Sequence, residues 1–303
     1  MFEKRQIDAI NAALGARRPL LVRGEPGIGK SQLARAAAKV LGWAYLPFVA
    51  DARTESRDLL WHFDAVARLA DAQAQQGEPD GENKEQTLPI GKYLTPGVLW
   101  WAFNWQDAKD QAEKATVPIP SQHDQGSNDK GCVVLIDEID KADSDVPNGL
   151  LEALGIGQFP VRDRNEPVRI GDKPLLVVIT TNEERTLPDA FIRRCLVLHL
   201  ALSTDEQEAK RHFMTVGKAH FGDAFADEML QQAAELVAEE RSKAAQRHWR
   251  PLPGQAEYLD LLRSIEAQAG KDRDRQQSLL ETVAEYILAK DPAAARRWSE
   301  SQK

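Results

Sequence analysis

The segment GEPGIGKS, at residues 24–31, constrains the fold more than any other part of the chain. It matches the pattern G-x-x-x-x-G-K-[ST], and it lies between a short apolar run at residues 19–22 and an alanine-rich stretch at residues 32–41. A glycine-rich turn between a strand and a helix can cradle phosphate groups, because its backbone N–H groups and the helix N-terminus face the anion. The pattern therefore predicts a strand, a phosphate-binding loop and a helix. A turn that only starts a helix would not need lysine and serine at these offsets.

Different residue types in this loop are predicted to have different roles. Lys30 places a positive charge on the terminal phosphates, and Ser31 ligates Mg²⁺ through its hydroxyl. The other predicted nucleotide contacts are the glycines and their neighbours: Gly24, Glu25, Pro26, Gly27, Ile28, Gly29 and Gln32. A dinucleotide site would need G-x-G-x-x-G, whereas the glycines here follow the order G-x-x-G-x-G.

Polar residues follow two apolar runs, at the positions where parallel α/β sheets bind ligands. Asp137 and Glu138 end the first run; Asp137 is predicted to hold Mg²⁺ together with Ser31, and Glu138 to orient or deprotonate an attacking water. Asn182 ends the second run, where an amide can hold that water or contact a phosphate, although asparagine also ends strands in ordinary turns. A nucleotide switch that never hydrolyses would have little use for Glu138.

Strand signals alternate with helical ones over the first two thirds of the chain. The apolar runs at residues 132–136 and 175–180 are typical of parallel strands covered on both faces, and residues 44–49 give a further strand. These signals predict an α/β fold with a doubly wound parallel sheet, which is the fold of P-loop nucleoside triphosphatases.

Two amphipathic helices are expected around these strands, and more follow them. The first ends at Gly15, and the second covers residues 56–74 with four apolar side chains on one face: Leu59, Phe63, Val66 and Leu69. After Leu202 only helical spacing remains. The sequence therefore predicts an α/β nucleotide-binding domain at residues 1–202 and a small all-helical domain at residues 203–303.

Two polar segments, near residues 75–90 and 116–131, are predicted to be exposed insertions in the α/β domain. Between them lie Trp100, Trp101 and Trp105. These tryptophans are consistent with a buried helix packed on the sheet. They are also candidates, with the insertions, for contacts to a partner or substrate, the alternative being that the insertions are tolerated surface loops.

Composition excludes several other classes of protein. The net charge of -8 argues against constitutive coating of nucleic acid. Cys132 and Cys195 form no C-x-x-C pair, so a reducing cytoplasm is the expected location. The apolar runs are far shorter than the roughly 18 residues of a membrane span, and no signal peptide is recognised.

Taken together, four parts of the chain resemble an AAA+ ATPase of the MoxR-like branch: GEPGIGKS, VVLIDEIDKADSDVPNGLLEAL, ITTNEERTLPDAFIRRC and the helical tail. The segment GQFPVRDRNEPVRI also resembles the branch's β-hairpin ahead of the sensor-1 strand. The resemblance covers most of the chain and implies ATP and Mg²⁺ as ligands, with hydrolysis to ADP and phosphate. One departure is Trp61, where the branch commonly has glycine, and the two insertions lengthen the spacing between Walker A and Walker B.

The resemblance also assigns roles that the residue types alone leave open. Asn182 matches sensor 1, and Arg194 matches the arginine that reaches the γ-phosphate held by the adjacent subunit, with Arg193 as the alternative. Arg250 matches the sensor-2 arginine at the entry of the helical lid, or is an ordinary surface residue. These roles imply a homo-oligomeric ring, usually a hexamer, in which monomers are nearly inactive.

The same resemblance implies a chaperone-like function, in which ATP drives the remodelling or activation of a partner protein, often one with a von Willebrand factor A domain. Two alternatives remain open. A nucleic-acid-directed motor or loader would use a local basic ring formed by Arg162, Arg164 and Arg169, against the acidic balance of the chain. An ATP-gated switch or scaffold in a bacterial conflict or signalling complex would use hydrolysis only to reset itself.

Overall fold

A computed structural model describes residues 3–76, 88–121 and 126–288 of the chain. These residues form two compact units. The first contains Phe2–Arg23 and Lys30–His199, and the second contains Gly24–Gly29 and the residues from Leu200 onward. Much of the predicted insertion at residues 75–90, and residues 122–125 of the other insertion, lie outside the described residues.

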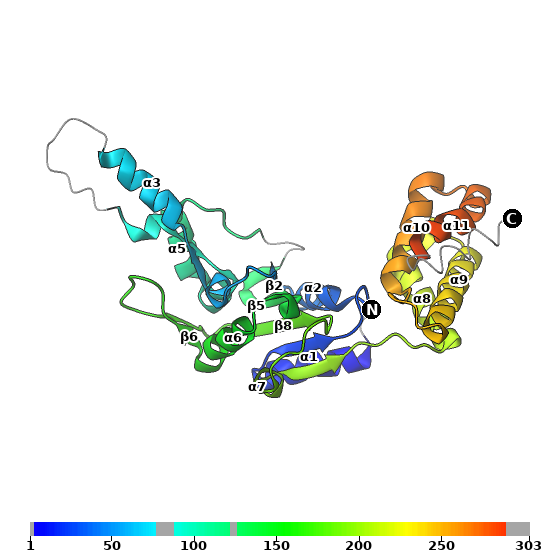
Figure 1. The fold of residues 1–303 in the computed structure, drawn as a ribbon, viewed down its shortest axis with the longest axis horizontal. Helices are drawn as coiled ribbons and strands as arrows, with labels where there is room; N and C mark the ends of the chain where they lie inside the picture. Colours follow the sequence, from blue (N-terminus) through cyan, green and yellow to red (C-terminus); the bar gives the residue numbers. More distant parts are fainter. Residues whose placement is uncertain (1–2, 77–87, 122–125, 289–303) are drawn as a thin grey trace. The chain divides into compact units, whose positions relative to one another are not determined.

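The described part of the first unit is organised around a five-stranded parallel sheet with the order β2-β5-β8-β1-β9. Figure 1 labels β2, β5 and β8 of this sheet. Its strands are β1 (Leu20–Arg23), β2 (Trp43–Val49), β5 (Ser127–Asp137), β8 (Leu175–Thr181) and β9 (Leu196–His199). The parallel α/β sheet predicted from the apolar runs is therefore confirmed. Because the chain leaves β1 toward β2 on one side and returns to β9 on the other, the loop after β1 lies at a switch point of the topology.

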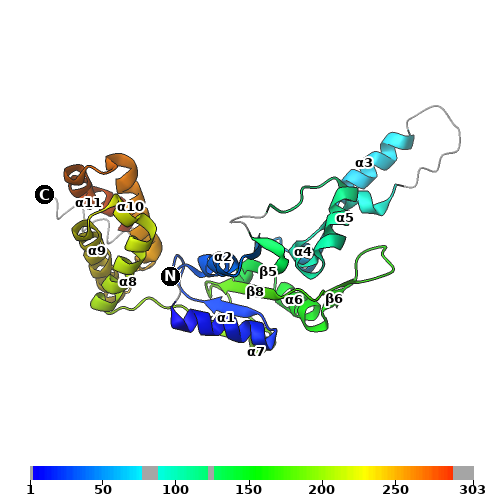
Figure 2. The ribbon, with the colours of Figure 1, turned by 180° about the vertical axis from the view of Figure 1, so that it is seen from behind.

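Helices cover both faces of this sheet. Helix α2 (Lys30–Leu41) and helix α1 (Lys4–Ala16) lie on opposite sides of it in both views (Figures 1 and 2). Helix α4 (Val98–Phe103) contacts β2 and β5 of the sheet, and α7 (Asp189–Arg194) contacts β9. Helix α6 (Asp145–Ile156) packs against α7. Helix α1 continues one residue past Gly15, and Arg17 takes the left-handed conformation at its end (φ 51°), so the predicted glycine cap is wrong.

The single helix predicted over residues 56–74 is also wrong. The chain forms the 3₁₀ turn η1 (Ser56–Leu59), the strand β3 (Trp61–Phe63) and helix α3 (Ala65–Gln76). Strand β3 pairs in antiparallel fashion with β4 (Leu94–Pro96), which follows the 3₁₀ turn η2 (Ile90–Tyr93). The pairing of residues 61–63 with a distant strand outweighs local helical spacing and interrupts the predicted helix. Val66 and Leu69 are 79% and 60% exposed, so the predicted apolar face does not form.

The tryptophan-rich segment forms a buried helix, as predicted. Trp100 and Trp101, in α4, are 0% and 4% exposed, and Trp105 opens helix α5 (Trp105–Ala115) and packs against Trp101. The alternative that Trp100 and Trp101 contact a partner is therefore wrong for this fold. The prediction of an insertion at residues 116–131 is wrong for residues 127–131, because these residues already belong to β5.

A short hairpin, β6 (Gln158–Phe159) with β7 (Val168–Arg169), follows α6. The indole Nε1 of Trp61 donates a hydrogen bond to the backbone oxygen of Pro160 in this hairpin, at 3.1 Å. Trp61 therefore holds the hairpin to the strand β3.

The second unit has its own core, formed by α8 (Glu206–Phe221), α9 (Asp227–Gln246), α10 (Gln255–Ala269) and α11 (Arg273–Leu288). Phe213 of α8 stacks on Tyr258 of α10, with ring centroids 5.1 Å apart, and both are 0% exposed. The short 3₁₀ turn η5 (Gly222–Ala224) links α8 to α9. This helical core matches the helical content predicted after Leu202.

Candidate nucleotide-binding site

The loop after β1 has the backbone of a phosphate cradle. Gly27 and Gly29 take φ values of 77° and 92°, which side chains other than glycine rarely adopt. A Cβ on Gly27 would also lie 2.7 Å from the Cβ of Ala256 in α10. Since α2 begins at Lys30, the positive end of its helix dipole lies at the loop and favours an anion there.

Lys30 is buried beside the end of β8. Its Nζ donates a hydrogen bond to Oδ1 of Asn182 at 2.7 Å, and its side chain is 6% exposed. Burial lowers the pKa of Lys30, while the nearby carboxylates of Asp137, Asp140 and Glu138 act in the opposite direction. The ammonium group of Lys30 suits an anionic ligand, and the carboxylates around it suit a cation bound together with that ligand.

Ser31 and Asp137 meet next to this lysine. The hydroxyl of Ser31 donates to the carboxylate of Asp137, at 2.9 Å to Oδ1 and 2.8 Å to Oδ2. Thr180 of β8 donates to the same carboxylate, and its hydroxyl accepts from the backbone N–H of Glu138 at 3.0 Å. The serine hydroxyl and the carboxylate are oxygen donors of the kind that Mg²⁺ prefers, so these residues fit the predicted ion.

Glu138 is held in an unusual backbone conformation. Its φ of 58° lies in the left-handed region, which is uncommon for residues other than glycine and is concentrated at functional sites. Lys141 pairs with its carboxylate at 2.7 Å, and Asn182 Nδ2 donates to it at 3.4 Å. Because Lys30 and Glu138 contact opposite ends of the Asn182 amide, that side chain links the lysine to the acid.

Arg193 and Arg194 lie elsewhere in the same unit. They end α7, their side chains are exposed, and neither makes an ion pair within the described ranges. The structure therefore does not bring these arginines together with Lys30, Ser31, or the carboxylates.

In the second unit, the start of α10 lies against the loop. Gln255 Nε2 lies 3.3 Å from the position a Cβ on Gly29 would take, and Gln255 Oε1 is 2.9 Å from Nε2 of His212. Arg250 is exposed in the turn before this helix. The structure thus places Gln255 and Ala256, rather than Arg250, against the loop.

Arg241 of α9 also contacts the loop, and the sequence reasoning missed it. Its side chain is 1% exposed and pairs with Glu25 at 2.8 Å, while donating to the backbone oxygens of Leu202 at 3.1 Å and Pro253 at 3.0 Å. A signal was present, because Arg241 falls four residues after Val237 on the apolar face of the helix. A charged residue on such a face is buried only when it is paired.

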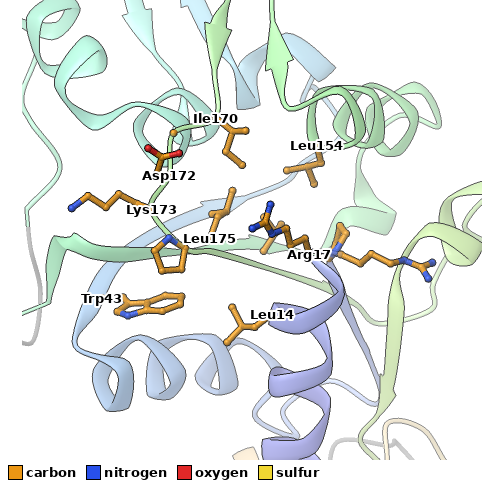
Figure 3. A pocket seen from close by; sticks show the side chains of 13 residues that line it. Leu14, Arg17, Trp43, Leu154, Ile170, Asp172, Lys173 and Leu175 are labelled. Atoms are coloured by element: carbon orange, nitrogen blue, oxygen red, sulfur yellow. The ribbon is translucent and has the colours of Figure 1, made fainter.

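A cavity of about 570 Å³ lies at the other edge of the sheet (Figure 3). Trp43 and Leu175, in its lining, are the first residues of β2 and β8, whereas the loop follows the last residue of β1. Because the strands are parallel, their starts and ends lie at opposite edges. The cavity is therefore separate from the candidate nucleotide site.

In the part of the chain that the structure describes, no helix is long and apolar enough to cross a membrane.

No curated protein matches the sequence. Among solved structures, the crystal structure of a proposed ATPase from Cytophaga hutchinsonii is 14% identical, with a TM-score of 0.41 over 97% of this chain and 80% of that one. The model of the AAA domain family, dynein-related subfamily, matches residues 19–195, which is more than half of the chain. The chain is therefore a member of the AAA domain family (dynein-related subfamily), whose fold and ATP-driven activity agree with its sheet and its loop.

Proposed function

We propose that this AAA protein hydrolyses ATP to ADP and phosphate at the site formed by the loop, Lys30, Ser31, Asp137, Glu138 and Asn182. The loop and Lys30 bind the phosphates, and Asn182 and Glu138 position the attacking water, with Glu138 taking its proton. Ser31 and Asp137 would hold Mg²⁺, which would supply charge neutralisation at the phosphates.

The observation that carries this proposal is the meeting of α2 with the ends of β5 and β8. The hydrogen bonds from Ser31 to Asp137 and from Lys30 to Asn182 join the start of α2 to the ends of β5 and β8. A glycine-rich turn with only a structural role would not require a buried lysine beside four carboxylates. The same arrangement supports binding of the phosphates, binding of Mg²⁺ and positioning of the attacking water at one site.

We further propose that the site is completed by an adjacent subunit of a ring, usually a hexamer. Arg194, or its neighbour Arg193, would reach the γ-phosphate held by that subunit. The exposure of both side chains, and their separation from the site of their own subunit, support this role. Arg250 remains the candidate for the arginine acting within the subunit, beside the observed contact of Gln255 with the loop.

The proposed work of the ring is remodelling or activation of a partner protein in the cytoplasm, as the likeness to the MoxR-like branch implies, with a von Willebrand factor A domain as one candidate partner. A nucleic-acid motor is less well supported, because the three arginines that would line its pore contact their own chain. Arg164 pairs with Asp107 through two bonds of 2.9 Å, Arg162 lies over the ring of Phe63, and Arg169 donates to Gln158. A switch or scaffold role would use the same hydrolytic residues.

Substitution of Lys30 tests the proposed site. Lys30→Ala should weaken ATP binding and abolish hydrolysis, whereas Lys39→Ala, which removes an exposed lysine from the same helix, should change neither. Binding is measured by titration with a fluorescent ATP analogue and hydrolysis by phosphate release. Unchanged ATP affinity in Lys30→Ala would contradict the assignment of the loop.

A further inference from the structure

Arg18 binds the end of the helix that carries the two exposed arginines. Its Nε donates to the backbone oxygen of Arg194 at 3.0 Å, and its terminal nitrogen donates to the backbone oxygens of Arg193 and Cys195, the latter at 3.4 Å. The last carbonyls of a helix have no partner within the helix, and a cation at that end is favourable. Arg18 therefore fixes the backbone of α7 at the residues from which both arginine side chains project.

The backbone around Arg18 is itself firmly held. Arg18 N–H donates to the oxygen of Ala13 at 3.1 Å, which ties it to the end of α1. One residue later, the oxygen of Pro19 accepts from the N–H of Leu196 at 2.8 Å, where β9 begins beside β1. The segment before β1 thus holds residues 193–196 by side-chain and main-chain bonds together.

This arrangement fixes the backbone of Arg193 and Arg194 while leaving their side chains exposed. We propose that Arg18 is a positioning residue for the arginine that reaches the neighbouring subunit's γ-phosphate. It acts on the direction of that arginine and does not touch the nucleotide. The inference rests on the proposed function, because it requires a site shared between subunits.

The guanidinium of Arg18 suits this role better than an ammonium would. Its planar fork reaches three successive carbonyls from one side, whereas lysine offers a compact charge that cannot span them. Lysine at this position should keep the favourable charge at the helix end and lose part of the directional hold. The conservative variant is therefore expected to recover part, but not all, of the function.

The test compares Arg18→Gln and Arg18→Lys with Arg17→Gln, which removes the adjacent exposed arginine. For Arg18→Gln we expect kcat to fall about 10- to 100-fold, as for a catalytic group displaced by about 1 Å, with ATP affinity and particle size unchanged. The kcat of Arg18→Lys should fall less, and the kcat of Arg17→Gln should equal that of the unmodified protein. Equal kcat values for Arg18→Gln and Arg17→Gln would overturn the proposal.

Mixed rings separate positioning from general damage. Arg18→Gln subunits keep Glu138, so mixing them with Glu138→Gln subunits, which keep a well-placed arginine, should restore activity. Mixing them with Arg194→Ala subunits should restore none, since no subunit then offers a well-placed arginine. Recovery with both partners, or with neither, would contradict the positioning role. If Arg18→Gln does not fold, Arg18→Lys gives the same pattern with a smaller loss, and its failure to do so counts equally against the role.

Failure of the shared site itself is recognised separately. A mixture of Arg194→Ala with Glu138→Gln subunits contains no change at Arg18. The corresponding mixture with Arg193→Ala contains none either. If neither mixture recovers activity, the shared site is refuted whatever Arg18 does. If one recovers while Arg18→Gln is fully active, only the role of Arg18 is refuted.

Discussion

The hydroxyl of Ser31 donates a hydrogen bond to the carboxylate of Asp137, at 2.8 Å to its nearer oxygen, although 106 residues separate the two in the sequence. Ser31 lies in the first turn of α2 and Asp137 ends β5, so their contact joins the start of this helix to the end of that strand. The contact holds together the two oxygen-bearing side chains that we propose bind Mg²⁺.

Removing the hydroxyl of Ser31 or the negative charge of Asp137 should weaken the magnesium-dependent part of ATP affinity. We expect Ser31→Ala and Asp137→Asn each to cost about tenfold, or ~1.4 kcal/mol, and the double variant to cost less than their product, because both act on one ion. Titration with a fluorescent ATP analogue in Mg²⁺ and in EDTA measures this, with Ser144→Ala, an exposed serine, as control. Losses of the same size in EDTA would contradict a role in binding the ion.

Glu138→Gln should separate binding from turnover. The amide keeps the size of the side chain but does not accept a proton from water, so kcat should fall about 10²- to 10⁴-fold while ATP stays bound. Steady-state kinetics and retention of radiolabelled ATP measure the two quantities. Glu152→Gln, an exposed acid on α6, is the matched control. A variant that keeps full turnover would exclude Glu138 as the base.

The exposed arginines at the end of α7 should matter for hydrolysis and not for binding. Arg194→Ala is expected to lower kcat about 10³- to 10⁵-fold, the range seen for arginine fingers. Mixed with Glu138→Gln subunits, it should regain activity. If Arg193→Ala alone shows this behaviour, Arg193 is the residue that acts on the neighbouring site.

Trp100 should act on stability rather than on partner binding. It is fully buried, and its Nε1 donates to Asp107 at 2.8 Å. Trp100→Ala is therefore expected to lower the free energy of unfolding by about 3–5 kcal/mol, against less than about 0.5 kcal/mol for the exposed Leu69→Ala. Urea denaturation followed by circular dichroism gives both values. A loss of partner binding at unchanged stability would contradict this account.

The two cysteines should be protected in the native state. Burial raises the pKa of Cys132 and of Cys195 to about 12, so few thiolates exist at pH 8. A thiol reagent at pH 8 should label neither residue in the native protein and both in denaturant. Because the unfolded thiols ionise near pH 9, the free energy of unfolding should fall as the pH rises above that value. Rapid labelling of the native protein would show that these side chains are accessible.

Sequence reasoning succeeded where the signal was local or followed from the rules of parallel sheets. The phosphate loop is recognised from the fixed spacing of its glycines, lysine and serine, and the apolar runs before Asp137 and Asn182 identify buried strands. Because the ends of parallel strands share one edge, these two residues were expected near Lys30, as the structure has them.

The remaining features depend on contacts between distant residues. Trp61 belongs to a strand only because residues 94–96 pair with it, and no local pattern contains that information. The contact of Arg18 with Arg194 joins residues 176 apart, and Arg241 pairs with Glu25 across 216. Helical spacing located α9 and placed Arg241 on its apolar face, but it did not identify Glu25 as the partner of that charge.

The dependence of the ATPase rate on protein concentration tests the central claim, that hydrolysis occurs at a site shared between subunits. The measurement combines phosphate release with light scattering in ATP and Mg²⁺ over a range of protein concentrations. We predict that the rate per subunit rises as particles of hexamer size form, and that Glu138→Gln particles assemble without turnover. A rate per subunit that stays constant while the protein remains a monomer throughout would contradict the shared site.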